Sequence, residues 1–186
     1  MNKQFRAFLL VFTLLALSRT TQAQLEVTHL ILKGQSATGF GAFIHGGFPV
    51  SKGDEIGVEA NFDFFAPDSS HLVFIPLLVT YRYTFNRTGT GFYVEPVAGY
   101  TFGTTDVQAK DGNGNLLYNA DGSEVDEKFN GAAAGLGVGY IIPDAHYPLN
   151  FCLRYEHVFV SGAAPSLLSF RVSWSVLTGR RLQGQQ

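Results

Sequence analysis

The sequence predicts an all-β protein: an eight-stranded antiparallel up-and-down transmembrane β-barrel. Three observations favour this fold class. Apolar and polar residues alternate along long segments, the chain opens with a short apolar segment of the export type, and the connections between segments alternate in length. A period of two residues is the period of a strand whose two faces meet different surroundings.

The composition fits a chain of many strands with an apolar exterior. Charged residues make up 15% of the 186 residues, against roughly a quarter in soluble domains, and the chain holds 21 glycines and 17 phenylalanines. The net charge of -2 gives no basic surface for nucleic acid. With Cys152 as its single cysteine, the chain cannot form an intramolecular disulfide, and we expect Cys152 to be a small packing residue.

Residues 1–23 are predicted to be a secretory signal peptide. Lys3 and Arg6 precede the apolar run at 7–17, and the small residue Ala23 ends the segment as a cleavage site does. The run is too short for a membrane anchor, which needs about 20 apolar residues. Because Gln24 rather than cysteine follows, a lipoprotein signal is not predicted. No later segment offers 18 consecutive apolar residues, so spanning helices are not expected.

The barrel is predicted to occupy residues 24–178, followed by a periplasmic tail at 179–186. We expect strands at 24–33, 37–49, 54–65, 71–86, 90–104, 128–142, 149–160 and 167–178. The connections VSKGD, NRTG and PDAHYP are short and share one end, whereas the connection at 104–127 is long and leaves from the other. Short inner turns and longer outer loops are the pattern of outer-membrane barrels, so localisation in the cell outer membrane is predicted.

Alternation alone does not say which face meets lipid. A soluble lipocalin-like barrel would bury the apolar faces, and this alternative stays open. Strand lengths sufficient to cross a bilayer and a polar face with both signs of charge favour lipid outside. So do aromatic residues near strand ends, which would form interfacial girdles: Tyr81, Tyr83, Phe85, Tyr93, Tyr155, Phe159 and Trp174.

Under this model the polar faces meet inside the barrel. Arg82 is expected opposite Glu95 if the loop is 87–90, and diagonal to it if the turn is 87–88. Eight strands leave an interior that side chains just fill, so a structural ion network that plugs the lumen is predicted, with a gated polar pathway as the alternative. Its members would be Glu26, Glu55, Glu59, Asp63, Arg82, Glu95, Arg154, Glu156 and Arg171. Pro76 and Pro96, which remove ladder donors, are predicted to lie at bulges.

The chain resembles the small outer-membrane β-barrel family, whose familiar members are the outer-membrane protein A barrel and its X-type relatives, in a Bacteroidetes-like version. The resemblance rests on the signal peptide and on FIPLLVTYRYTF, GFYVEPVAGYTFG, FNGAAAGLGVGYIIP, LNFCLRYEHVFV and SLLSFRVSWSV. It covers essentially the whole mature chain. It implies a Gram-negative outer membrane, membrane lipids as partners and a structural or surface-interaction role.

An enzymatic alternative is a lipid A deacylase-like protein. His157 and Ser161 would lie at the outer rim, with Glu156 or Asp68 to orient the histidine. The chain lacks the deacylase spacing of His and Ser, so we expect no catalytic residues, no cofactor and no metal.

The long connection at 104–127 contains DGNGNLLYNADGSE. Leu116 stands where a calcium loop of the EF-hand type needs glycine, so that site is rejected. The turn signals Asp111-Gly112 and Asp121-Gly122 instead favour a short hairpin that extends the barrel and could bind a surface ligand or protein.

Overall fold

The computed structural model describes residues 20–32, 35–66, 71–108, 126–142, 149–160 and 164–175. Nine strands occur in these ranges. Their bounds are β1 Thr20–Leu32, β2 Gln35–Ser51, β3 Asp54–Phe65, β4 Leu72–Thr84, β5 Gly91–Gln108, β6 Asp126–Lys128, β7 Gly131–Ile142, β8 Leu149–Phe159 and β9 Ser166–Ser175. Within the described residues, no helix is long and apolar enough to cross a membrane.

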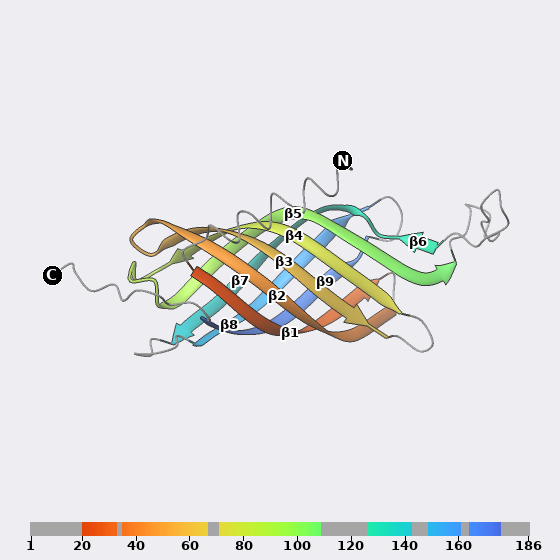
Figure 1. Ribbon diagram of the computed structural model, residues 1–186, viewed down its shortest axis with the longest axis horizontal. Helices are drawn as coiled ribbons and strands as arrows, with labels where there is room; N and C mark the ends of the chain where they lie inside the picture. The colour runs from red at the N-terminus through yellow and green to blue at the C-terminus, as the bar shows by residue number, and fades with distance from the viewer. Residues whose placement is uncertain are drawn as a thin grey trace.

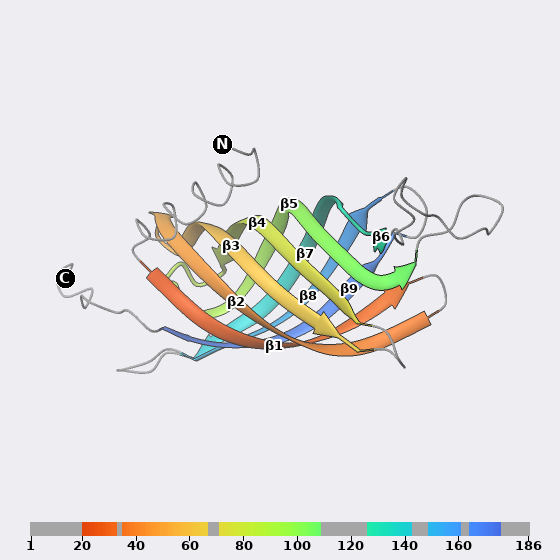
Figure 2. The same cartoon turned by 45° about the vertical axis from the view of Figure 1, so that its right-hand side comes forward.

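Eight of the strands form a closed antiparallel barrel, which confirms the predicted fold class. Each wall strand pairs with its neighbours in the order β4-β3-β2-β1-β9-β8-β7-β5, and β5 pairs back to β4. Closure between the first and last wall strands runs from Gln22↔Ser175 to Ile31↔Ser166. The strands wind obliquely around the barrel axis (Figures 1 and 2).

The observed strands match the predicted ones within a few residues, and β3 has the predicted bounds. β1 begins at Thr20, so its first four residues precede the predicted cleavage point after Ala23. Cleavage there would leave a strand that still pairs from Gln24↔Phe43 onward. The predicted tail at 179–186 lies outside the described residues.

The ninth strand, β6, is the end of the predicted strand 128–142, separated from β7 by Phe129 and Asn130. Gly103 explains the interruption, because its N–H donates to Asn130 Oδ1 at 3.0 Å while its carbonyl accepts from Phe129 N–H at 3.0 Å. β5 and β6 project from the end of the barrel opposite the turns at residues 52–53 and 86–90 (Figure 1). This projection is the part of the predicted extension that the structure describes. Residues 109–125 of the extension lie outside the described residues.

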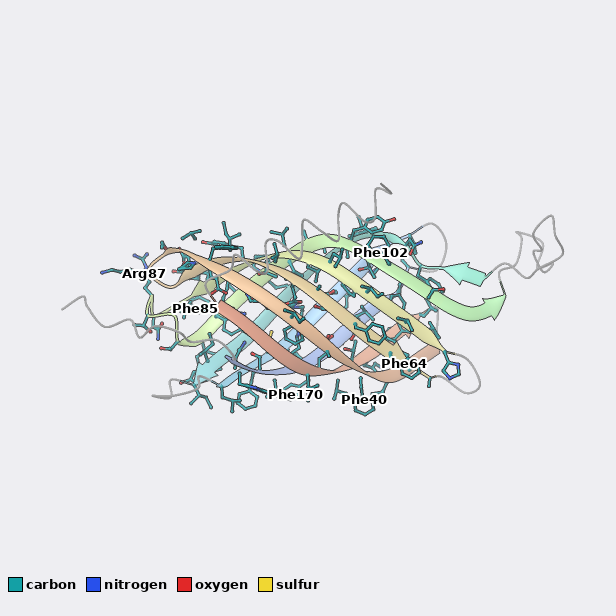
Figure 3. The ribbon with its side chains drawn as sticks, viewed as in Figure 1. Phe40, Phe64, Phe85, Arg87, Phe102 and Phe170 are labelled. Atoms are coloured by element: carbon teal, nitrogen blue, oxygen red, sulfur yellow. The ribbon has the colours of Figure 1, made fainter. Side chains whose placement is uncertain are left out.

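The apolar faces point outward and the polar faces inward. On β3, Phe62 is 50% exposed whereas the adjacent Asp63 is 2% exposed. Figure 3 shows Phe40, Phe64, Phe102 and Phe170 projecting away from the wall. The lipocalin-like alternative is therefore wrong, because a barrel in water would have the opposite arrangement.

One of the predicted girdle residues was placed on the wrong face. Tyr93 points into the lumen, is 2% exposed, and donates from its hydroxyl to Asn150 Oδ1 at 2.9 Å. It has the same parity as Glu95, two residues along β5, and the strand period forces both to the same side. The other six predicted girdle residues lie on the outer face: Tyr81, Tyr83, Phe85, Tyr155, Phe159 and Trp174.

The bulges predicted at Pro76 and Pro96 are also wrong. Each proline keeps regular register with one neighbouring strand, at Pro76↔Thr101 and Pro96↔Leu136. On its other side the ladder skips two residue pairs without a shift of register: β3–β4 between Ala60↔Leu77 and Asp63↔Phe74, and β4–β5 between Thr80↔Val97 and Tyr83↔Val94. A missing N–H is thus accommodated by a gap in the ladder on either side of β4.

Candidate functional site in the barrel lumen

A cluster of buried ions fills the middle of the lumen, with Glu59 of β3 at its centre. The Glu59 carboxylate accepts hydrogen bonds from Arg154 Nη1 at 2.6 Å and Arg154 Nη2 at 3.3 Å. It also accepts from Arg171 Nη2 at 2.9 Å and Nη1 at 3.2 Å. His45 Nδ1, from the pair His45↔Glu59, lies 3.5 Å from the same carboxylate. Two guanidinium groups therefore share one carboxylate.

The Arg154–Glu59 pair crosses the full width of the barrel. Arg154 lies on β8 and Glu59 on β3, and three strands separate β8 from β3 in either direction around the wall. Side chains from opposite walls thus meet at the axis, and both residues are almost fully buried.

A second carboxylate, Glu95, links Arg154 to Arg82. Arg154 Nη2 donates to Glu95 Oε1, and Arg82 Nε donates to Glu95 Oε2 at 2.7 Å. The pairs Thr80↔Val97 and Tyr83↔Val94 place Arg82 directly opposite Glu95, as expected for the longer of the two predicted loops. The Arg82 guanidinium also lies 4.7 Å from the centre of the Tyr93 ring.

The remaining acids surround this core. Arg171 Nε lies 3.0 Å from Glu26 Oε2, Arg154 Nη1 donates to Glu156 Oε1 at 3.2 Å, and Arg82 Nη1 donates to Glu55 Oε1 at 3.5 Å. Asp63 is buried but has no base within ion-pair distance among the described residues. It accepts from Thr28 Oγ1 at 3.0 Å.

Glycine and aromatic residues on the inner face make room for the ions and cover them. At Gly57 a Cβ would lie 2.4 Å from the His45 ring, and at Gly41 it would lie 2.3 Å from Asp63 Oδ1. Even an alanine at these positions would displace a buried polar group. The Arg171 guanidinium also lies 3.3 Å from the centre of the Phe43 ring.

Apolar clusters close both ends of the ion cluster. At the end from which β5 and β6 project, the lumen holds Leu30, Phe65, Leu72, Phe74, Phe129 and Leu167. At the turn end, Tyr93, Ile141 and Cys152 pack together, which confirms Cys152 as a buried packing residue. Apolar side chains therefore pack beyond the ion cluster toward both ends of the lumen.

The structure brings together all nine predicted lumen residues and adds His45, which sequence reasoning missed. His45 Nε2 lies 3.0 Å from Glu55 Oε1, so His45 bridges Glu55 and Glu59. Its parity was readable, because His45 lies two residues from Phe43 and Gly47 in a strand whose other face carries Ala42 and Ile44. The sequence also did not predict the apolar cluster around Phe65 and Phe74, because at residues 72–75 both faces of β4 are apolar and the alternation of apolar and polar residues is lost.

The residues of the enzymatic alternative do not assemble as expected. Glu156 lies in the lumen, on the opposite face of β8 from His157, so it cannot orient that histidine. His157 Nδ1 is instead 2.9 Å from Ser166 Oγ across the β8–β9 pair. Ser161 and Asp68 lie outside the described residues. In the part of the chain that the structure describes, no group of His, Cys, Asp and Glu could hold a metal ion.

Comparison with solved structures identifies the architecture. Neisserial surface protein A is 17% identical with a TM-score of 0.53, over 82% of this chain and 94% of that protein. Ail, the attachment invasion locus protein of Yersinia pestis, is 10% identical with a TM-score of 0.54, over 84% of this chain and 96% of that protein. The chain has the fold of the small eight-stranded outer-membrane barrels.

The sequence matches no family model and no curated protein. The outer-membrane enzyme PagL is 12% identical over 80% of this chain and 97% of that one, with a TM-score of 0.46.

Proposed function

We propose that this protein is an integral outer-membrane barrel with a sealed lumen and a structural or surface-interaction role. The apolar outer surface is suited to lipid, and the buried backbone of the wall is satisfied by closure of the sheet. The turns at residues 52–53 and 86–90 face the periplasm, and β5 and β6 project from the cell surface.

The observation that carries this proposal is the contact between Arg154 and Glu59 across the lumen. A solute or ion in transit would have to break hydrogen bonds of 2.6 to 3.3 Å between groups that have almost no access to water. Separating such a pair leaves uncompensated charges in a confined space, which costs several kcal/mol. The ion cluster therefore acts as a permanent plug that ties opposite walls together.

Conductance across a planar lipid bilayer tests the sealed lumen. The refolded mature chain should show the different gel mobility before and after boiling that marks a folded barrel, yet no steady ion current. The double variant Glu59→Ala/Arg154→Ala, which removes the crossing pair, should conduct more than the parent if it stays folded. A steady current through the parent protein would overturn the plug and favour the gated pathway.

The non-enzymatic part of the proposal has its own test, because His157 and Ser166 do form a hydrogen-bonded pair. Lipid A from cells that express the protein should keep its mass. Loss of an acyl chain that is abolished by His157→Ala would replace this proposal with the deacylase-like alternative.

The surface-interaction role concerns the connection at 104–127. Its described ends, β5 and β6, pair at Thr104↔Lys128, where β5 still pairs with β4, and at Gln108↔Asp126, past the last β4–β5 pair Leu72↔Thr105. Replacing residues 109–125 with a short Gly-Ser turn should leave refolding intact and abolish any binding of cells to a surface ligand or protein. Unchanged adhesion phenotypes would leave only the structural role.

A further inference from the structure

Two hollows lie end to end on the outer face of β3, β4 and β5. The first, at the turn end, has a volume of about 370 Å³ and is lined by Ser51, Lys52, Asp54, Tyr83 and Arg87. The second has a volume of about 310 Å³ and lies farther along the wall, lined by Ile56, Val79, Thr80, Tyr81, Pro96, Val97 and Ala98.

The register of β3 and β4 places the two hollows next to each other. The pair Asp54↔Tyr83 lines the first hollow, and the pair Ile56↔Tyr81 lines the second. These pairs follow each other on the same face, about 7 Å apart along the strands. The charged hollow at the end of the wall thus lies next to the apolar hollow, here called the groove, which is farther along the wall.

The charged end is held in place by two turns that pack against each other. Thr84 N–H donates to Gly53 O at 2.9 Å, and a Cβ at Gly53, whose φ is +88°, would lie 2.5 Å from Arg87 Cα. Arg87 itself has a φ of 54° and donates from its N–H to Thr84 O at 3.0 Å. Lys52 precedes Gly53, so this packing holds the backbone of two exposed basic residues, Lys52 and Arg87, at the same hollow.

The apolar hollow forms where the outward side chains of β5 are small. Pro96 and Ala98 present small outward groups on β5, next to the gap in the β4–β5 ladder. Val79 and Tyr81 form the opposite side, and Val79 is 56% exposed.

We propose that this site binds one glycerophospholipid from the leaflet at the turn end. The phosphate lies between Lys52 and Arg87, and an acyl chain lies along the groove past Tyr81. The inference rests on the proposed function, because the groove must face lipid. Its occupant follows from the order of the chemistry along the wall: cations at the membrane edge complement a phosphodiester, and the apolar groove beneath complements methylene groups.

The residues around Lys52 and Arg87 are of the types that are found beside lipid headgroups. Tyr83 and Phe85 pack edge to face with ring centres 5.4 Å apart, and aromatic residues concentrate at the membrane interface. Arg87 and Phe85 lie together at the turn end of the barrel (Figure 3). Asp54 places one carboxylate beside the two cations, where it can accept a hydrogen bond from a hydroxyl or ammonium group of the headgroup.

Native mass spectrometry of the refolded mature chain in detergent tests the proposal. The probes are dioleoyl phosphatidylethanolamine, dioleoylglycerol, which lacks the phosphate, and inorganic phosphate, which lacks the chains. We expect one retained molecule of the phospholipid and weaker retention of both other probes. Equal retention of dioleoylglycerol would overturn the phosphate contact, and retention of inorganic phosphate alone would overturn the lipid assignment.

Matched variants separate the two ends of the site. Lys52→Ala and Arg87→Asn, the latter chosen because asparagine tolerates a positive φ, should each weaken retention about fivefold, and Lys52→Arg should restore it. Val79→Trp should block the groove. Val27→Trp is its control, because Val27 is 43% exposed on β1, a strand that lines neither hollow. Equal effects of the two tryptophan variants would overturn the groove.

Gel mobility before and after boiling is recorded for every variant. If the folded parent enters bilayers but retains the phospholipid no better than its variants do, this inference fails and the proposed function stands. If the parent does not enter bilayers, both fail.

Discussion

Arg154 and Glu59 meet at the axis of the barrel from strands on opposite walls, with Arg154 Nη1 2.6 Å from Glu59 Oε1. Most contacts in an up-and-down barrel join neighbouring strands, so this pair is one of the few that hold the cross-section as a whole. Arg171 adds a second guanidinium to the same carboxylate. Through these contacts the Glu59 carboxylate joins three strands, β3, β8 and β9.

Removing Glu59 should destabilise the barrel strongly. Glu59→Ala leaves Arg154 and Arg171 without their shared partner in a buried site, and we expect a loss of about 3–5 kcal/mol in the free energy of unfolding. Urea unfolding in lipid vesicles measures it. The matched control is Glu55→Ala on the same strand, where the side chain keeps 19% exposure and the loss should be smaller. Equal losses at the two positions would contradict a central role for Glu59.

The pair formed by Arg82 and Glu95 should show coupling in a double-mutant cycle. The two residues face each other at the gap that Pro96 leaves in the β4–β5 ladder, so the ion pair joins two strands where backbone bonds are missing. Arg82→Ala and Glu95→Ala should each destabilise the barrel, with a coupling of roughly 0.5–3 kcal/mol.

Glu95→Ala should cost more than Arg82→Ala, because Glu95 also accepts a hydrogen bond from Arg154. A cycle between Arg82 and Glu26, which share no hydrogen bond or ion pair, is the control. Strictly additive losses for Arg82 and Glu95 would show that the pair contributes nothing as a unit.

The direction of the side chains can be read with fluorescent labels. In a Cys152→Ser background, Val79→Cys should place a label in lipid, where brominated lipids quench it. Thr80→Cys should place the next label in the lumen, shielded from the same quencher, because Thr80 is 1% exposed. Quenching at position 80 in place of 79 would invert the barrel and require an apolar interior with charges in lipid.

Much of this architecture could be predicted from the sequence because one period governs it. A strand has two faces, and Glu55, Glu59 and Asp63 already share one, so correct phase at a single residue fixes the whole strand. The predicted face is wrong where it rests on the type of residue and not on its position in the alternation. Tyr93 was assigned to the membrane interface as an aromatic residue, although its parity with Glu95 places it in the lumen.

Other features could not be read from the sequence, for physical reasons. Whether a proline in a strand produces a bulge or a gap depends on which neighbour its nitrogen faces, and that is a property of the pairing. The contact of Arg154 with Glu59 depends on which strands stand opposite each other after closure. Strand pairing and the arrangement of strands across the lumen both join residues that are far apart in the sequence. The alternation of apolar and polar residues along one strand therefore does not reveal them.

The apolar cluster of Leu30, Phe65, Leu72, Phe74, Phe129 and Leu167, at the end of the barrel from which β5 and β6 project, gives the last prediction. Phe65 and Phe64 are adjacent on β3, but Phe65 is fully buried in the lumen, edge to face with Phe74 at 5.8 Å between ring centres, whereas Phe64 is 39% exposed on the outer face. Phe65→Ala should leave a cavity that its neighbours cannot fill and cost about 3–5 kcal/mol. Phe64→Ala should cost less, because lipid chains can occupy the vacated space. Urea unfolding in vesicles compares the two. A larger loss at Phe64 would show that the barrel draws its stability at this end from the lipid contact and that the lumen is not packed there.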